Sequence, residues 1–149
     1  MQLDSLYQEV IMDHYKNPTH KKLLNVFDTQ VHHVNPSCGD EQDLNLVTDG
    51  KSITSIGWSG VGCSISQAST SIMSDLLEGK DIDDALKIHN AYQEMILSKG
   101  KINGDEALLE DAVVLAGVSK FPARVKCALL GWMAFKDALS QALEKKGVK

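Results

Sequence analysis

Four side chains of this 149-residue sequence could bind a metal ion or carry thiol chemistry: Cys38, Asp40, Cys63 and Cys127. Cys38 and Asp40 share the stretch NPSCGDE, in which a proline and a glycine mark a tight turn. Aspartate is common in turns because it bonds nearby backbone, so Asp40 alone has a structural interpretation as well. Three widely spaced cysteines do not suggest a disulfide framework, and they leave buried inert thiols, reactive thiols or metal ligands as alternatives.

The other two cysteines lie in motifs of their own. Cys63 follows several glycines in GWSGVGCSISQAS, where a predicted strand passes into a predicted helix. The positive end of a helix favours a thiolate there, although a small residue packed at a crowded joint gives the same pattern. Cys127 in FPARVKCALLGW is about 200° around its helix from Val125 and therefore off the expected apolar stripe. Arg124 and Lys126 are close to Cys127 and favour its thiolate form.

Together these residues offer more than each offers alone. If the three cysteines converge at one end of a sheet with Asp40, they form a tetrahedral set suited to zinc. The same set, being asymmetric, also suits an iron–sulfur cluster. The sequence contains no C-x-x-C pair, so the spacing alone is a weak indication.

The five histidines are not expected to be ligands. His32 and His33 are adjacent on a predicted strand and point to opposite faces. His14 follows the apolar face of the first helix, and we expect His20 and His89 at the surface.

The elements that must position these residues indicate one α+β domain over residues 1–149. Helical periodicity over residues 3–15 predicts a first helix, which Pro18 ends. Three strands follow, at residues 27–34, 42–48 and 53–61. Their connections are too short for crossover helices, which predicts an antiparallel meander. Further helices are predicted at residues 64–78, 81–97, 105–115 and 122–145.

Composition narrows the class of protein. The residues are 43% hydrophobic and 23% charged, as in ordinary globular proteins, and the net charge of −5 argues against a general nucleic-acid binder. No apolar run approaches the roughly 18 residues needed to span a membrane. The start MQLDSLYQEV lacks the basic and apolar regions of a signal peptide. We therefore expect a cytoplasmic protein that binds neither nucleic acid nor membranes.

The motifs NPSCGDE, GVGCSISQAS and FPARVKCALLGW together resemble the iron–sulfur assembly proteins of the IscU/NifU N-terminal-domain family. The stretch LYQEVIMDHYKNPTH fits as well, so the resemblance covers nearly the whole chain. It is strongest to the SufU-type branch, because residues of about 80–105 look like the insertion of that branch. Lys126 stands where IscU-type members have a histidine. FPARVK replaces their chaperone-binding LPPVK, so recruitment of an Hsp70-type chaperone does not carry over.

The resemblance implies a three-stranded antiparallel sheet with an N-terminal helix and several C-terminal helices packed on one side, the SufE/NifU/IscU-like fold. It implies a site at the sheet edge with zinc at rest, held by Cys38, Asp40, Cys63 and Cys127 and supported by Arg124. In the SufU-type interpretation, Cys38 accepts persulfide sulfur from a SufS-type cysteine desulfurase and passes it towards downstream iron–sulfur assembly proteins. This role is sulfurtransferase-like.

Two alternatives remain open at this point. In the IscU-type interpretation the protein is a non-enzymatic scaffold, on which a transient [2Fe–2S] cluster is built. In the other, the zinc site is purely structural and does no thiol chemistry.

Overall fold

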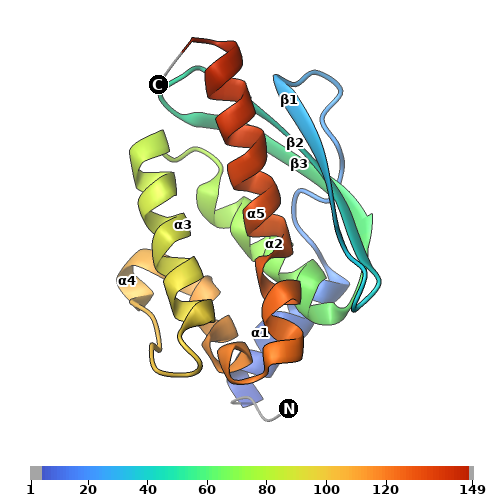
Figure 1. The fold of residues 1–149 in the computed structure, drawn as a ribbon, viewed down its shortest axis with the longest axis vertical. Helices are drawn as coiled ribbons and strands as arrows, with labels where there is room; N and C mark the ends of the chain where they lie inside the picture. The colour runs from blue at the N-terminus through green and yellow to red at the C-terminus, as the bar shows by residue number, and fades with distance from the viewer. Residues whose placement is uncertain (1–4, 148–149) are drawn as a thin grey trace.

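The computed structural model describes residues 5–147, in which helices lie to one side of a single three-stranded sheet (Figure 1). The α+β architecture predicted from the sequence is therefore confirmed. The first two residues of the predicted first helix, residues 3 and 4, lie outside the described residues. In chain order the elements are α1 (Ser5–Lys16), β1 (Thr29–Asn35), β2 (Asp40–Thr48), β3 (Ile53–Val61), α2 (Ser64–Leu77), α3 (Ile82–Leu97), α4 (Glu106–Leu109), the 3₁₀ helix η1 (Glu110–Lys120) and α5 (Pro122–Lys145).

The sheet is the predicted antiparallel meander, in the order β1-β2-β3. Its register pairs Val31 with Leu44 and Leu44 with Trp58, so these side chains share the face that the helices cover. The β1–β2 ladder ends with the pair of Asn35 and Asp40, and the turn between these two residues contains Cys38. The sheet therefore presents the NPSCGD motif at one of its ends.

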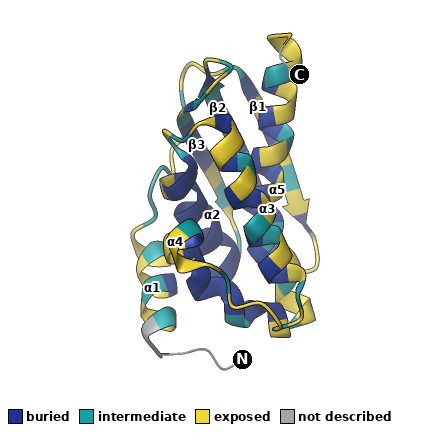
Figure 2. Ribbon diagram, turned by 90° about the vertical axis from the view of Figure 1, so that its left-hand side faces the viewer, coloured by how far each residue is buried: buried dark blue, intermediate teal, exposed yellow. Residues whose placement is uncertain are grey.

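Helix α2 lies at the centre of the molecule and is buried almost all round (Figure 2). Its many serine and threonine side chains are satisfied by neighbouring elements. Ser69 Oγ donates to the Ala128 carbonyl of α5 at 2.7 Å, and Thr70 Oγ1 donates to Gln42 Oε1 of β2 at 2.9 Å. These bonds attach α2 to both α5 and the sheet, the two structures that complete the cysteine site.

The predicted helix over residues 105–115 is wrong beyond Leu109. Glu110 has a φ of 48°, in the left-handed region, which ends α4 after one turn. The chain then continues as η1, whose apolar residues are buried against α1, α3 and α5. Packing against these three helices outweighs the local preference for an α-helix.

The expected surface position of His89 is also wrong. His89 is fully buried in α3, and its Nε2 lies 2.9 Å from the carbonyl oxygen of Trp132. Burial lowers the pKa of His89, so the ring is neutral in the core. His20 is partly exposed and faces Asp75 and Glu78. Within residues 5–147, no helix combines the length and apolar character required to cross a bilayer.

Candidate metal centre

Cys38 lies on the turn between β1 and β2. The turn is closed by two backbone bonds, from Cys38 N to the Asn35 carbonyl and from Gly39 N to the Pro36 carbonyl. Gly39 has a φ of 69°, a backbone conformation that glycine adopts without the strain of a side chain. The thiol of Cys38 is half-buried, so it is accessible from outside the molecule.

Cys63 lies immediately before the first turn of α2, as the sequence predicts. Gly62 precedes it with a φ of 159°, and a side chain there would collide with Asp40 and Ser66. The absence of a side chain at residue 62 therefore lets the strand end approach Asp40 closely. The backbone N–H of Cys63 donates to Asp40 Oδ1 at 2.9 Å.

Cys127 lies in the second turn of α5 and is fully buried. Its position off the predicted apolar stripe therefore does not expose it. Helix α5 packs against both α2 and the sheet, so its buried face is wider than the one stripe that the periodicity shows. The contact between α5 and the sheet brings the thiol of Cys127 next to Cys38 of the β1–β2 turn.

The three elements bring a compact group of ligand atoms together. The sulfur atoms of Cys38 and Cys127 are 3.0 Å apart. Within the described part of the chain, three ligand atoms come within 4.8 Å of one another only at Cys38, Asp40 and Cys127. Cys63 lies beside this group and is attached to it through its backbone bond to Asp40. Its role as a fourth ligand stays a prediction.

Asp40 is the hydrogen-bonding centre of the site and is only 1% exposed. Its carboxylate accepts from Asn35 Nδ2 at 3.2 Å, from Ser66 Oγ at 3.1 Å and from the backbone N–H of Cys63. Burial raises the pKa of Asp40, but the hydrogen bonds outweigh burial and the pKa lies below its usual value. Asp40 is therefore an ionised, hard oxygen ligand among softer sulfurs.

The pKa of the Cys127 thiol is shifted in the opposite direction to that of Asp40. Burial raises the pKa of Cys127, and its hydrogen bonds with Cys38 and Asp40 and the charge of Cys63 raise it further. The protein alone therefore keeps this sulfur protonated, because several negative charges would otherwise share a small volume. A dication would remove that penalty, and three thiols with one carboxylate form a donor set that suits zinc. The residues present thus fit the zinc ion that the family resemblance implies.

Arg124 is exposed at the start of α5, and its guanidinium lies 3.9 Å from the sulfur of Cys38. The pKa of Arg124 is raised by contact with Cys127 and by negative charge on the thiols. The geometry therefore favours stabilisation of the Cys38 thiolate by Arg124 over orientation of Asp40. Lys126, at the position of the missing histidine, is exposed.

Sequence reasoning missed Asn35 and Ser66. Asn35 is 5% exposed, and its Nδ2 is within hydrogen-bonding reach of both Asp40 and Cys127 Sγ, the latter at 3.6 Å. Asn35 opens the NPSCGD turn and Ser66 is three residues after Cys63, so proximity to the cysteines was the available signal.

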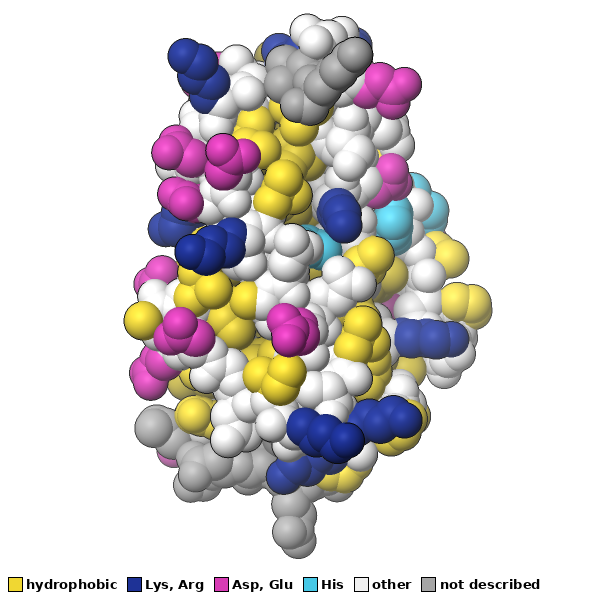
Figure 3. Space-filling view, turned by 60° about the vertical axis from the view of Figure 1, so that its left-hand side comes forward, with side chains coloured by type: hydrophobic (Ala, Val, Ile, Leu, Met, Phe, Trp, Pro, Cys, Tyr) yellow, Lys and Arg dark blue, Asp and Glu magenta, His cyan; other side chains and the backbone are white. Residues whose placement is uncertain are grey.

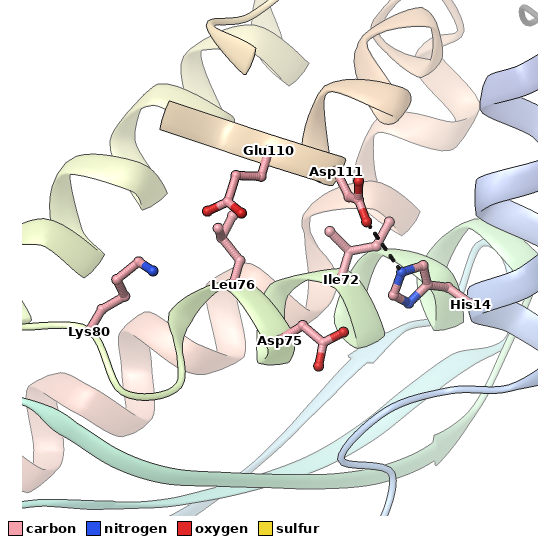
Figure 4. A pocket seen from close by; sticks show the side chains of 7 residues that line it. All are labelled: His14, Ile72, Asp75, Leu76, Lys80, Glu110 and Asp111. Carbon is pink, nitrogen blue, oxygen red and sulfur yellow. Dashed lines mark ion pairs between the residues drawn. The ribbon is translucent and has the colours of Figure 1, made fainter. Parts of the chain in front are cut away.

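Away from the cysteines, a cavity of about 260 Å³ lies between α1, α2 and η1 and has no cysteine in its wall (Figure 4). His14 Nε2 is 4.0 Å from Asp111 there, and Asp75 and Glu110 point in different directions (Figure 4). These ionisable groups do not converge on one point, so the cavity does not compete with the cysteine site as a metal centre.

Comparison with known proteins shows the family of the chain. The family model of the NifU-like N-terminal domain matches residues 6–145. The chain is 45% identical over 142 residues to the zinc-dependent sulfurtransferase SufU of Bacillus subtilis, covering 93% of this chain and 92% of that protein. It is 39% identical over 140 residues to the iron–sulfur cluster assembly scaffold protein IscU of Streptococcus pyogenes serotype M1, covering 94% and 86%.

Solved structures give the same answer. The crystal structure of FiSufU from Fervidobacterium islandicum AW-1 matches with a TM-score of 0.80 and 36% identity, over 88% of this chain and 94% of that one. The N-terminal NifU-like protein of Brucella abortus shares the fold, with a TM-score of 0.83 at 24% identity, over 93% of this chain and 95% of that one. The resemblance predicted from the motifs is confirmed: the chain belongs to the family of NifU-like N-terminal domains.

Proposed function

We propose that this protein is a zinc-dependent acceptor of persulfide sulfur in iron–sulfur cluster assembly, with Cys38 as the acceptor. One observation carries the proposal. In the group formed by Cys38, Asp40 and Cys127, only Cys38 is accessible, whereas Asp40 and Cys127 are 1% and 0% exposed. A partner can therefore reach one thiol while the remaining residues keep the site together.

The metal would be held by Cys38, Asp40, Cys63 and Cys127. Zinc, when bound, keeps coordinating thiols deprotonated at neutral pH. The other requirements fall to the chain itself. Arg124 stabilises negative charge on the sulfur of Cys38, and Asn35 and Ser66 keep Asp40 ionised and in place.

In the transfer step, the thiolate of Cys38 attacks the terminal sulfur of a persulfide on the partner's cysteine. A sulfur–sulfur bond forms at Cys38 while the partner's sulfur–sulfur bond breaks. The partner's cysteine leaves as a thiolate, so electrons balance without an external oxidant. Because the chain is 45% identical to SufU, we assign the donor as a SufS-type cysteine desulfurase and the compartment as the cytoplasm. The receivers are downstream iron–sulfur assembly proteins.

The same likeness supports the domain assignment. We treat residues 1–149 as one domain. Within it, the segment from about residue 80 to about residue 105, which contains α3, is the SufU-type insertion. The likeness to IscU supports a second candidate function, that of a scaffold for a [2Fe–2S] cluster as cargo. The two candidates differ in what the purified protein contains.

The test uses purified protein, a SufS-type desulfurase and L-cysteine. Wild-type protein should stimulate sulfide release in the presence of a reductant and should carry one added sulfur on Cys38 by mass spectrometry. Cys38→Ala should lose both, with an unchanged circular dichroism spectrum because Cys38 lies on a surface turn. Stimulation by Cys38→Ala at the wild-type level would refute the acceptor role. Stable iron and sulfide in place of zinc in freshly purified protein would favour the scaffold.

A further inference from the structure

The thiols of Cys38 and Cys127 are in direct contact. Both cysteines are free, and their sulfur atoms are 3.0 Å apart. A disulfide bond is about 2.05 Å long, so the two sulfurs need to approach each other by only about 1 Å to form one. The contact therefore suits a reaction between the two sulfurs as well as shared binding of a metal ion.

The turn that carries Cys38 can supply this movement. The two backbone bonds that close the turn are long, at 3.3 Å from Cys38 N and 3.4 Å from Gly39 N. A Cβ added at Gly39 would meet no atom within 4 Å, so the turn faces open space. The N–H and carbonyl of Cys63, by contrast, make three hydrogen bonds of 2.9, 3.0 and 3.1 Å. Movement of Cys38 towards Cys127 therefore disturbs less of the structure than movement of Cys63.

The two thiols differ in what can reach them. Cys38 is half-buried, whereas Cys127 is 0% exposed. The guanidinium of Arg124 lies 3.9 Å from the sulfur of Cys38, and lysine and arginine side chains gather at the lower end of the molecule, where α5 begins (Figure 1 and Figure 3). This positive charge favours the thiolate of Cys38, which is the form that peroxides oxidise. An accessible, oxidisable thiol therefore touches a buried one.

We propose that Cys38 and Cys127 form a site of reversible oxidation by hydroperoxides in the metal-free protein, in which Cys38 is oxidised first and Cys127 then closes a disulfide bond with it. An accessible cysteine next to a resolving cysteine is the arrangement that oxidation-sensing proteins use. The inference does not depend on sulfur transfer, because it needs only the contact between the two sulfurs and the exposure of one of them.

The reaction takes place in two balanced steps. The thiolate of Cys38 attacks one oxygen of the hydroperoxide, and the oxygen–oxygen bond breaks. The sulfur is oxidised to a sulfenic acid, while the peroxide is reduced to an alcohol, or to water in the case of hydrogen peroxide. The sulfur of Cys127 then attacks the sulfur of Cys38, so that a sulfur–sulfur bond forms and the sulfur–oxygen bond breaks. The departing hydroxide takes up the thiol proton of Cys127 and leaves as water.

The disulfide bond would change the site in two ways. It engages two of the four proposed ligands, so we expect that the oxidised protein cannot bind zinc until a thiol reductant reopens the bond. It also protects Cys38 from further oxidation to the sulfinic acid, which thiol reductants do not reverse. A zinc ion bound by both sulfurs should in turn prevent the disulfide, because the metal and the bond compete for the same two atoms.

The experiment exposes the full chain to hydrogen peroxide, either after metal removal by a chelator or with zinc bound, and maps the thiols by mass spectrometry. Metal-free wild type should lose the mass of two hydrogen atoms and yield a peptide pair joined through Cys38 and Cys127. Dithiothreitol should restore both thiols and zinc binding. Zinc-loaded protein should keep its free thiols under the same treatment. In urea, where the contact between the two sulfurs is lost, the pairing of the cysteines should become mixed.

Substitution of each cysteine in turn separates the roles of the three thiols in the metal-free protein. Cys127→Ser should leave Cys38 as a sulfenic acid that dimedone traps, and longer treatment should convert it to the sulfinic acid. Cys38→Ser should leave the buried thiol of Cys127 unoxidised. Cys63→Ser is the matched control, because it removes the third thiol and should still form the bond between Cys38 and Cys127.

Three results would overturn the proposal. The first is a disulfide that joins Cys63 to either of the other cysteines or joins two chains. The second is a sulfinic acid on Cys38 of metal-free wild type beside a free thiol at Cys127. The third is the same mixture of pairings with and without urea, which would show that the folded chain does not select the pair.

Discussion

Asp40 shows how single residues determine what the cysteines can do. Its carboxylate receives hydrogen bonds from β1, from the start of α2 and from the first turn of α2. It therefore ties the turn that carries Cys38 to the helix that follows Cys63. The carboxylate thus acts on the geometry of the site as well as on its charge.

Asn35→Ala is expected to weaken zinc binding about 10- to 100-fold, because the side chain of Asn35 orients the Asp40 carboxylate through a hydrogen bond. The variant should also lower the free energy of unfolding by about 1–3 kcal/mol, since it leaves buried polar atoms with one donor fewer. Zinc affinity is measured by competition with a chelating dye, and stability by urea denaturation of metal-free protein.

Asn45→Ala is the matched control for this substitution. Asn45 is fully buried in the same sheet, but its side chain bonds Leu24 and Gln30, away from the thiols. It should lose stability and keep its zinc affinity. Equal zinc affinity in Asn35→Ala and wild type would show that Asn35 has only a structural role.

The sequence predicted some of these residues and missed others for physical reasons. Cys38 and Asp40 are two residues apart, so one turn brings them together. The burial of Cys127 could not be predicted from the periodic pattern, because that pattern shows one apolar stripe, whereas α5 has neighbours on two sides. Asn35 was missed because asparagine before a turn more often bonds its own backbone, and only the folded chain brings α5 next to it.

At the scale of elements, the distance between α2 and α5 sets the separation of the residues that they carry. Gly131 of α5 lies directly against Thr70 of α2, and an added Cβ would collide with Thr70 Oγ1 and lie 2.9 Å from its Cβ. Thr70 cannot turn away freely, because its hydroxyl bonds Gln42 and the Ser66 carbonyl. The close approach of the two helices therefore depends on glycine at residue 131.

Gly131→Ala is expected to destabilise the protein by about 1–3 kcal/mol, because overpacking outweighs the gain in helix propensity. Urea denaturation measures the change. The cost should be smaller in a Thr70→Ala background, where the colliding hydroxyl and methyl are gone. Equal cost in both backgrounds would show that the contact with Thr70 is not the cause.

The elements themselves were largely predictable, since period-two and period-3.6 patterns mark β3, α2 and α5 to within a residue or two. The region of α4 and η1 was not. Its apolar residues are consecutive rather than periodic, and Glu110 adopts a left-handed backbone that no local sequence signal marks. Packing beneath three helices decides its conformation, and packing cannot be read from a short window.

At the scale of the whole molecule, the proposed metal site lies at the edge of a larger hydrophobic core, to which Cys127 belongs and against which Cys38 and Cys63 pack. The buried cluster extends through the sheet, α2, α3, η1 and α5, and its largest members include Trp58, Tyr92, Trp132 and Phe135. The thiols and the carboxylate are gathered at one end of this core. A chain of this size can bury enough apolar surface to fold without a metal ion.

Removal of zinc by a strong chelator is therefore expected to lower the Tm but leave the protein folded at 25 °C. Zinc that binds only the folded state adds about 2.7 kcal/mol when its free concentration is 100 times its Kd. Calorimetry measures the shift in Tm, and far-UV circular dichroism tests whether the helices remain. Cys127→Ser should show a smaller shift, because a ligand is lost. Loss of helix at 25 °C on chelation would show that the apolar core cannot maintain the fold by itself, and it would mean that Asp40 and the thiols hold β1, α2 and α5 together only when a metal is bound.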